Sequence, residues 1–165
     1  MNKLKSGLLV LATAFFVFFA YNAVVSTRTI QVAGASMYPT LTDGEIIPIH
    51  YREEQQLPKR SDIVIVRRDG ENVVKRVIGL PSETVRIENG IVYINDEPLI
   101  QEGGISPAIT DEISSVTLSG DEYFIMGDNR TDSWDSRSLS FGEVHLKDIV
   151  AIVEQEKLAD STPNP

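Results

Sequence analysis

The chain has 165 residues, which is enough for one domain and an appendage, and its formal net charge is −9 at pH 7. No basic patch is concentrated in the sequence, which excludes the usual nucleic-acid-binding classes. The absence of cysteine excludes disulfides and thiolate metal sites, and the only histidines are His50 and His145. We therefore expect no metal, no cofactor and no nucleic-acid partner.

The N-terminal segment has the pattern of a membrane anchor. Residues 1–7 carry two lysines, and residues 8–25 form a run of 18 residues without charge, near the lower limit for a helix that crosses a bilayer. The lysines favour a cytoplasmic N-terminus, with the rest of the chain outside. A buried core helix and a cleavable signal peptide are the alternatives. We favour an uncleaved anchor because the small residues 33–35 lie too far beyond the apolar run to be its cleavage site.

After the anchor the sequence changes to short runs of β type. Asn89-Gly90 between two such runs is a strong hairpin signal, consistent with a type I′ turn. Pro48 indicates an edge or a bend. Many short strands separated by turns predict a mainly β, sandwich-like or barrel-like domain. The predicted strands cover residues 29–32, 45–50, 62–67, 71–78, 84–88, 91–95, 115–118, 122–126 and 149–153.

These strands place an extracytoplasmic domain at residues 26–157, with a β-hairpin and loop extension at about 83–120. Within the extension, residues 101–114 are rich in Gly, Pro, Ser and acidic side chains and are expected to form an exposed loop or the edge of the extension. Residues 158–165 are polar and Pro-rich, so we expect a disordered tail.

Ser36 is the first residue that could carry chemistry. It stands among small residues, in Gly34-Ala35-Ser36, and lies 11 residues beyond Val25, a tether of at most roughly 40 Å. A serine hydroxyl is a poor nucleophile at neutral pH and needs a base beside it.

Lys75 is a candidate for that base. Alternation along its strand places Lys75 and Arg76 on opposite faces, so one of the two cations must share a face with apolar residues. The simpler interpretation is that both reach water on flexible stems. If Lys75 is buried instead, desolvation lowers its pKa and leaves an amine that can accept the serine proton.

The segment from Gly127 to Arg137 follows an apolar strand and is dense in polar and charged groups. It could be a polar turn with local ion pairs, which contribute little when exposed. It could instead hold catalytic side chains in place by hydrogen bonds.

Together these features resemble the type I signal peptidases, the membrane-anchored Ser-Lys proteases that remove signal peptides from exported proteins. The resemblance runs from the anchor to about Val153, and the short chain with a single span is similar to the compact Gram-positive form. It rests on four ordered blocks: Ser36-Met37-Tyr38-Pro39-Thr40-Leu41, Asp62-Ile63-Val64, Val74-Lys75-Arg76-Val77-Ile78-Gly79-Leu80-Pro81, and Gly127-Asp128-Asn129-Arg130 with Ser133, Asp135, Ser136 and Arg137.

The resemblance implies a catalytic domain of coiled antiparallel β-sheets behind a single N-terminal transmembrane helix. Ser36 would be the nucleophile and Lys75 the general base, with Ser133 holding the lysine amine by a hydrogen bond. Asp135 and Arg137 would form a supporting ion pair. Pocket walls for small substrate residues would include Ile30, Val32, Met37, Leu41 and Val74, although ordinary core packing is an equal interpretation for each of them.

The same resemblance predicts a single-pass protein of the cell membrane that cleaves exported preproteins with small residues before the cut. The bilayer would be its second partner. The backbone N–H of Ser36 is the natural oxyanion donor. Some relatives add a serine two positions earlier, where this chain has Gly34, so the second donor is left to water or backbone. Ser82-Glu83 also departs from the Gly-Asp that often follows Leu-Pro in the family.

Two other functions stay open. One is a Ser-Lys processing peptidase with a different dedicated substrate, such as a pilin or a conjugation factor. The other is an inactive, membrane-anchored β-domain that binds exported peptides. Self-cleaving repressors also use a Ser-Lys pair, but they lack an anchor and usually carry a DNA-binding part.

Overall fold

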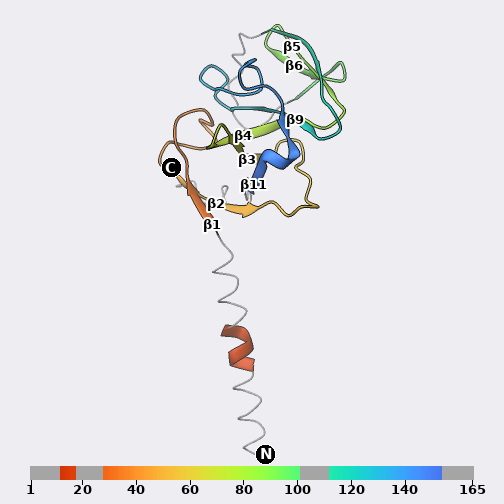
Figure 1. Ribbon diagram of the computed structural model, residues 1–165. Coiled ribbons are helices and arrows are strands. Elements are labelled where there is room, and N and C mark those ends of the chain that lie inside the picture. Colours follow the sequence, from red (N-terminus) through yellow and green to blue (C-terminus); the bar gives the residue numbers. More distant parts are fainter. Residues whose placement is uncertain (1–11, 18–27, 101–111, 154–165) are drawn as a thin grey trace, which may run out of the picture.

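The computed structural model describes residues 12–17, 28–100 and 112–153 (Figure 1). In this part of the chain the fold is mainly β, with a seven-stranded sheet of order β1-β2-β11-β3-β4-β9-β10 and a four-stranded sheet of order β7-β6-β5-β8. All the strand pairs are antiparallel. The elements are β1 (Arg28–Gln31), β2 (Ile46–Tyr51), β3 (Ile63–Arg68), β4 (Glu71–Gly79), β5 (Thr84–Glu88), β6 (Ile91–Ile94), β7 (Glu97–Pro98), β8 (Ile113–Thr117), β9 (Glu122–Met126), β10 (Val144–His145), the 3-10 helix η1 (Leu146–Asp148) and β11 (Ile149–Val153).

Strand β3 shows why the large sheet is packed on both faces. Its first four residues are all buried. Ile63 and Ile65 belong to one apolar cluster, whereas Val64 and Val66 belong to another. Successive side chains point to opposite faces of a sheet, so the continuous apolar run supplies both clusters. Burial of each such side chain stabilises the fold by about 1.5–3 kcal/mol, which fixes β3 beside β4, the strand that carries Lys75.

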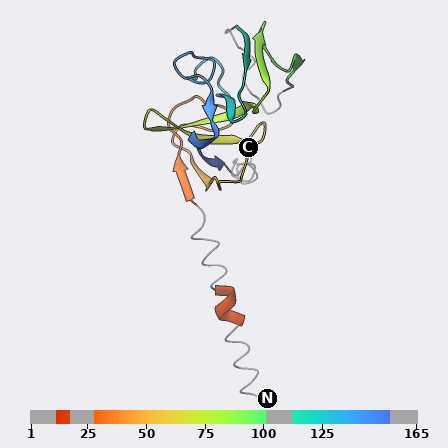
Figure 2. The same ribbon diagram turned by 45° about the vertical axis from the view of Figure 1, so that its right-hand side comes forward.

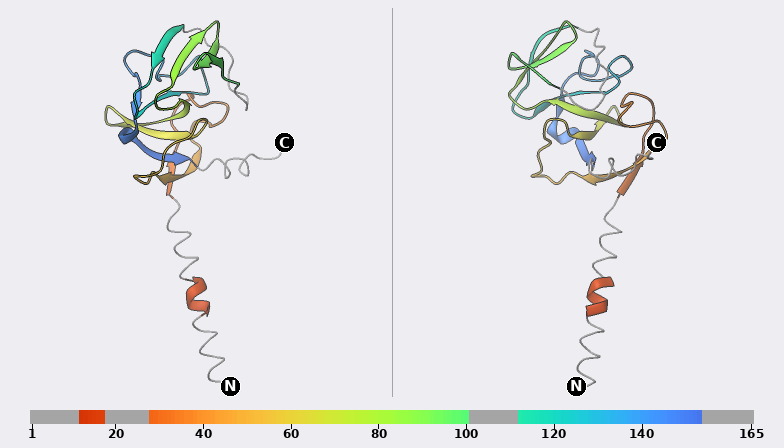
Figure 3. Two further views of the ribbon diagram at one scale, coloured as in Figure 1. Left: turned by 90° about the vertical axis from the view of Figure 1, so that its right-hand side faces the viewer. Right: turned by 180° about the vertical axis from the view of Figure 1, so that it is seen from behind.

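The small sheet joins the large one where β4 ends. Gly79 lies so close to its neighbours that an added Cβ would come within 2.6 Å of Val85 and 2.8 Å of Leu118. A third apolar cluster, which includes Ile78, Val85 and Phe124, continues from the large sheet into the small one. In all views the small sheet lies at the end of the β-domain opposite the helical residues 12–17 (Figures 2 and 3).

The predicted strands are confirmed with small shifts at their ends. The Asn89-Gly90 turn has positive φ at both residues, 51° and 78°, as a type I′ turn requires. The short strands β7 and β10 were not predicted, because two residues are too few for a pattern. Pro48 does not lie on an edge strand, since β2 runs between β1 and β11. However, β11 pairs only with Ile49–Tyr51, so Pro48 faces a strand on one side only.

The predicted anchor, residues 8–25, lies mostly outside the described residues. Residues 12–17 are helical and exposed. Within the described ranges, no helix reaches the length and apolar character needed to cross a bilayer. The predicted N-terminal segment 1–7, most of the loop at 101–114 and the tail 158–165 also lie outside the described residues, although Ile113 and Ser114 of that loop belong to β8.

Candidate active site

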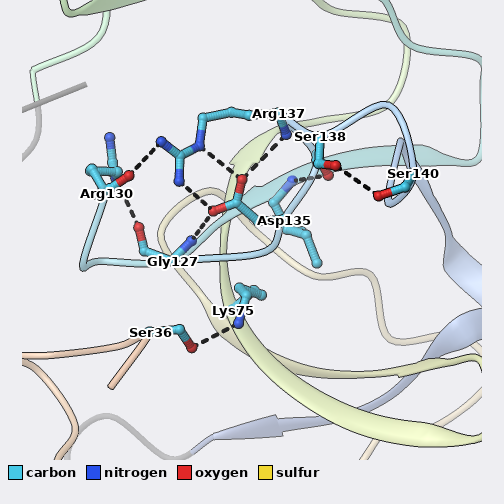
Figure 4. A network of polar contacts seen from close by, with 10 residues as sticks. Ser36, Lys75, Gly127, Arg130, Asp135, Arg137, Ser138 and Ser140 are labelled. Atoms are coloured by element: carbon cyan, nitrogen blue, oxygen red, sulfur yellow. Dashed lines mark hydrogen bonds and ion pairs between the residues drawn. The ribbon is translucent and has the colours of Figure 1, made fainter. Parts of the chain in front are cut away.

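Ser36 and Lys75 meet although 39 residues separate them. The Lys75 Nζ lies 2.8 Å from the Ser36 Oγ and donates a second hydrogen bond to the Val74 carbonyl at 3.0 Å. Lys75 projects from the interior of β4, and Ser36 lies in the turn that follows β1 (Figure 4). Met37 and Leu41 are buried in the core, so the turn is anchored directly after Ser36.

The Lys75 side chain is removed from water, with 4% of the residue exposed. Desolvation by burial lowers the pKa of the Lys75 amine below its ordinary value of 10.5, and the negative charge of Asp135 opposes part of this shift. The positive charge of Arg137 lowers the pKa further. A larger share of Lys75 is therefore neutral near physiological pH than of an exposed lysine, and a neutral amine can accept a proton.

Asp135 and Arg137 form a bidentate ion pair beside the Ser36–Lys75 contact (Figure 4). The Arg137 Nε and Nη2 donate to the two Asp135 oxygens at 2.8 and 2.9 Å, and the Gly127 backbone N–H donates to Asp135 Oδ2 at 2.8 Å. Burial would raise the pKa of the Asp135 carboxyl, but the donors from Arg137 and Gly127 outweigh it, so the pKa lies below 3.8. The charged pair therefore holds Gly127 in place.

Gly127 in turn lies against Ser36. A Cβ at this position would come within 2.4 Å of the Ser36 carbonyl oxygen and 2.3 Å of the Ser133 Oγ. The chain can pass this close to Ser36 only because glycine has no side chain. The backbone N–H of Asn129 then donates to the Ser36 carbonyl at 3.0 Å.

Ser133 lies beside these groups. Contrary to the prediction, it does not form a hydrogen bond with the Lys75 amine. Its Oγ is buried and has no hydrogen-bond partner among the described residues. It approaches the Asp135 carboxylate closely enough to help lower that pKa, although no hydrogen bond of ordinary geometry joins the two. The Lys75 amine is directed instead to Ser36 and to the Val74 carbonyl.

Arg76 is a buried cation that the strand pattern left ambiguous. Its Nε and Nη2 donate to the two Asp128 oxygens at 2.7 and 2.6 Å, and its Nη1 donates to the Ser61 carbonyl at 2.8 Å. Asp128 is fully buried. Both cations of the Lys75-Arg76 pair are therefore buried, because one meets the serine and the other meets a carboxylate from the loop after β9.

The remaining predicted residues lie in β1, in the segment that follows it and in β4. Gly34 has φ +84°, a conformation that favours glycine, and its N–H donates to Asp43. Val32, Met37 and Leu41 are buried core residues, so the packing interpretation fits them, and Ile30 and Val74 are partly buried against the same cluster. Ile30 and Val74 are therefore the remaining candidates for the walls of a substrate pocket.

The arrangement as a whole fits nucleophilic catalysis. It joins a hydroxyl to an amine with lowered pKa and surrounds both with a rigid polar support. Among the described residues, no group of His, Asp or Glu side chains could hold a metal ion.

Comparison with known proteins identifies relatives. Residues 4–155 match the family model described as signal peptidase, peptidase S26. The chain is 39% identical over 119 residues to signal peptidase I of Bacillus amyloliquefaciens, covering 65% of this chain and 63% of that protein. It is 38% identical over 122 residues to signal peptidase I S of Bacillus subtilis (strain 168), covering 65% and 64%. The chain thus spans less than two thirds of these relatives' length.

A solved structure of a signal peptidase I from Enterococcus faecalis V583 has a TM-score of 0.48 and 30% sequence identity, over 60% of this chain and 98% of that one.

Proposed function

Because this chain belongs to the signal peptidase family, peptidase S26, we propose that it is a serine endopeptidase that removes signal peptides from exported preproteins. The observation that carries the proposal is the 2.8 Å contact between the Ser36 Oγ and the buried Lys75 amine. A structural lysine gains little from burial beside a hydroxyl, since burial of an ammonium without a carboxylate partner is costly. A catalytic base gains the lowered pKa that it needs.

The mechanism follows from the contact. The neutral Lys75 amine accepts the proton of the Ser36 hydroxyl while the Oγ attacks the scissile carbonyl. The oxygen of that carbonyl becomes an oxyanion, which the Ser36 backbone N–H stabilises. The protonated amine then returns the proton to the leaving amino group, and an acyl-enzyme remains on Ser36. Lys75 deprotonates the water that hydrolyses this ester, which restores the free serine.

The substrate in this proposal binds as an extended strand. Edge strands offer unpaired backbone groups, and β1 has a neighbouring strand on one side only among the described residues. Ile30 of β1 and Val74 of β4 pack on the same cluster and are partly exposed. Shallow apolar walls of this kind fit small residues at the first and third positions before the cut.

The cellular setting is also part of the proposal. The uncharged run at residues 8–25 acts as a single-pass anchor with the N-terminus in the cytoplasm and the β-domain outside. Its described part, residues 12–17, is helical. The lipid bilayer and the preprotein are then the partners, and the chemistry needs no cofactor.

The proposal is tested by incubating the full chain in vesicles with a radiolabelled preprotein. We expect cleavage after the signal peptide, and loss of it in both Ser36→Ala and Lys75→Ala. Ser114→Ala and Lys147→Ala are the matched controls, since both side chains are exposed and lie outside the site. Cleavage that persists in Ser36→Ala would contradict the mechanism. A folded wild-type chain that binds the preprotein without cutting it would favour a binding domain.

A further inference from the structure

Asn129 holds the peptide units on both sides of Ser36. Its side-chain Nδ2 donates to the Ala35 carbonyl at 3.2 Å, and its backbone N–H donates to the Ser36 carbonyl at 3.0 Å. The Thr131 Oγ1 donates to the Asn129 Oδ1 at 3.0 Å. Because the amide oxygen is occupied by Thr131, the amide nitrogen is the group that faces Ala35.

The contact with Ala35 determines the direction of a different group. The Ala35 carbonyl and the Ser36 N–H belong to one peptide unit, and in a trans peptide these two groups point in opposite directions. The cis peptide bond found in the described residues is Tyr38-Pro39, so the Ala35-Ser36 unit is trans. The Asn129 side chain therefore directs the Ser36 N–H away from itself.

The Ser36 N–H is available for a ligand. Within the described ranges it donates to no backbone or side-chain acceptor. The Ala35 carbonyl, by contrast, accepts two hydrogen bonds, from Asn129 and from the Tyr38 N–H at 3.0 Å. Hydrogen bonds to a carbonyl polarise the amide and make its own N–H a stronger donor.

We propose that Asn129, fixed by Thr131, is a positioning residue that aims the Ser36 N–H at the oxyanion of the tetrahedral intermediate. This inference rests on the proposed peptidase function. It gives Asn129 a specific task because Gly34 supplies no side-chain donor to share the oxyanion. Asn129 does not contact the Lys75 amine, so its effect lies in stabilising charge and leaves the transfer of the serine proton unchanged.

The test compares Asn129→Ala and Thr131→Val with wild type on a signal-peptide-derived peptide. Removal of an oxyanion-hole donor lowers kcat by about 10²–10³-fold, and a donor that is only misdirected should lower it by about tenfold. We expect an unchanged KM and an unchanged pH midpoint of kcat/KM for Asn129→Ala, and a smaller loss of kcat in the same direction for Thr131→Val. Asn72→Ala, which removes an exposed amide near the start of β4, is the matched control.

A peptide boronic acid separates positioning from general disruption. Its tetrahedral adduct with Ser36 places a negative oxygen where the oxyanion forms, whereas a cleaved signal peptide does not. We expect boronate affinity to fall in parallel with kcat in Asn129→Ala, while affinity for the product peptide stays unchanged. Equal losses of both affinities, or wild-type kcat in Asn129→Ala, would overturn the inference.

Thr131→Val provides the test if Asn129→Ala does not fold. If Asn129→Ala does not fold, wild-type kcat and boronate affinity in Thr131→Val would overturn the inference. A parallel loss of both in Thr131→Val would support it. A wild-type chain that cleaves no peptide would refute the proposed function itself, which is a different result from active wild type beside an unaffected Asn129→Ala.

Discussion

At the scale of single residues, the proposed chemistry depends on the Lys75 amine. Its burial disfavours the charged form, and the carboxylate of Asp135 offsets this only in part. Asp135 is committed to Arg137 through two hydrogen bonds. Asp135 therefore supports the site, while the pKa of the Lys75 amine stays below its ordinary value.

The lowered pKa of Lys75 gives a pH dependence with a definite sign. The proposed mechanism requires the neutral amine, so kcat/KM should rise with pH and level off, with its midpoint below 10.5. Between the lowered pKa and 10.5 the unfolded chain binds more protons at this residue, so the free energy of unfolding should also rise over that interval. Lys75→Met should lack this contribution to the slope. Rate measurements and urea unfolding at a series of pH values test this, and a flat rate profile would contradict it.

At the scale of elements, the site depends on how closely the loop after β9 approaches the turn after β1. Gly127 is the point of contact, and the ion pair of Asp135 with Arg137 holds it through the Gly127 N–H. A second buried pair, Arg76 with Asp128, ties the same loop to β4. Strand, loop and turn are thus fixed relative to one another before any substrate binds.

Gly127→Ala tests this contact. Its Cβ would overlap the Ser36 carbonyl oxygen and Ser133, so the turn that carries Ser36 and the loop after β9 must shift relative to each other. A displacement of about 1 Å lowers activity by about 10²-fold, and we expect a loss of kcat/KM of that order. Gly120→Ala is the control, because its Cβ would meet nothing within 4 Å. Kinetics and circular dichroism distinguish a shifted site from an unfolded chain, and a folded Gly127→Ala with wild-type rates would exclude the close approach.

At the scale of the whole molecule, the β-domain has its own core. The residues of all three apolar clusters lie between Ile30 and Val153, and none comes from the helical residues 12–17. The stability of the domain should therefore not depend on the segment before β1.

Removal of residues 1–27 tests that division. We expect the shortened chain to fold, to keep its kcat on a soluble peptide, and to lose co-sedimentation with vesicles. Thermal unfolding, peptide kinetics and a vesicle pelleting assay measure the three properties in turn. Undiminished co-sedimentation of the shortened chain would contradict the proposed anchor, and failure to fold would contradict an independent β-domain.

The sequence by itself determined the local structure and the family. Alternating or continuous apolar runs predicted β3, β9 and β11, and Asn89-Gly90 predicted its turn, because strand pattern and turn conformation depend on neighbouring residues. The ordered blocks around Ser36 and Lys75 indicated the family that the family model identifies.

Only the tertiary structure decided which groups touch. The strand pattern could not tell whether Lys75 or Arg76 was buried, and both are, because the loop after β9 supplies Asp128 to one and packs Gly127 beside the serine that meets the other. The same loop determines that Ser133 Oγ has no hydrogen-bond partner among the described residues and that Asn129 donates hydrogen bonds to the backbone on both sides of Ser36. Contacts between residues so far apart in the chain arise from how strands pair and sheets pack, so local sequence patterns do not predict them.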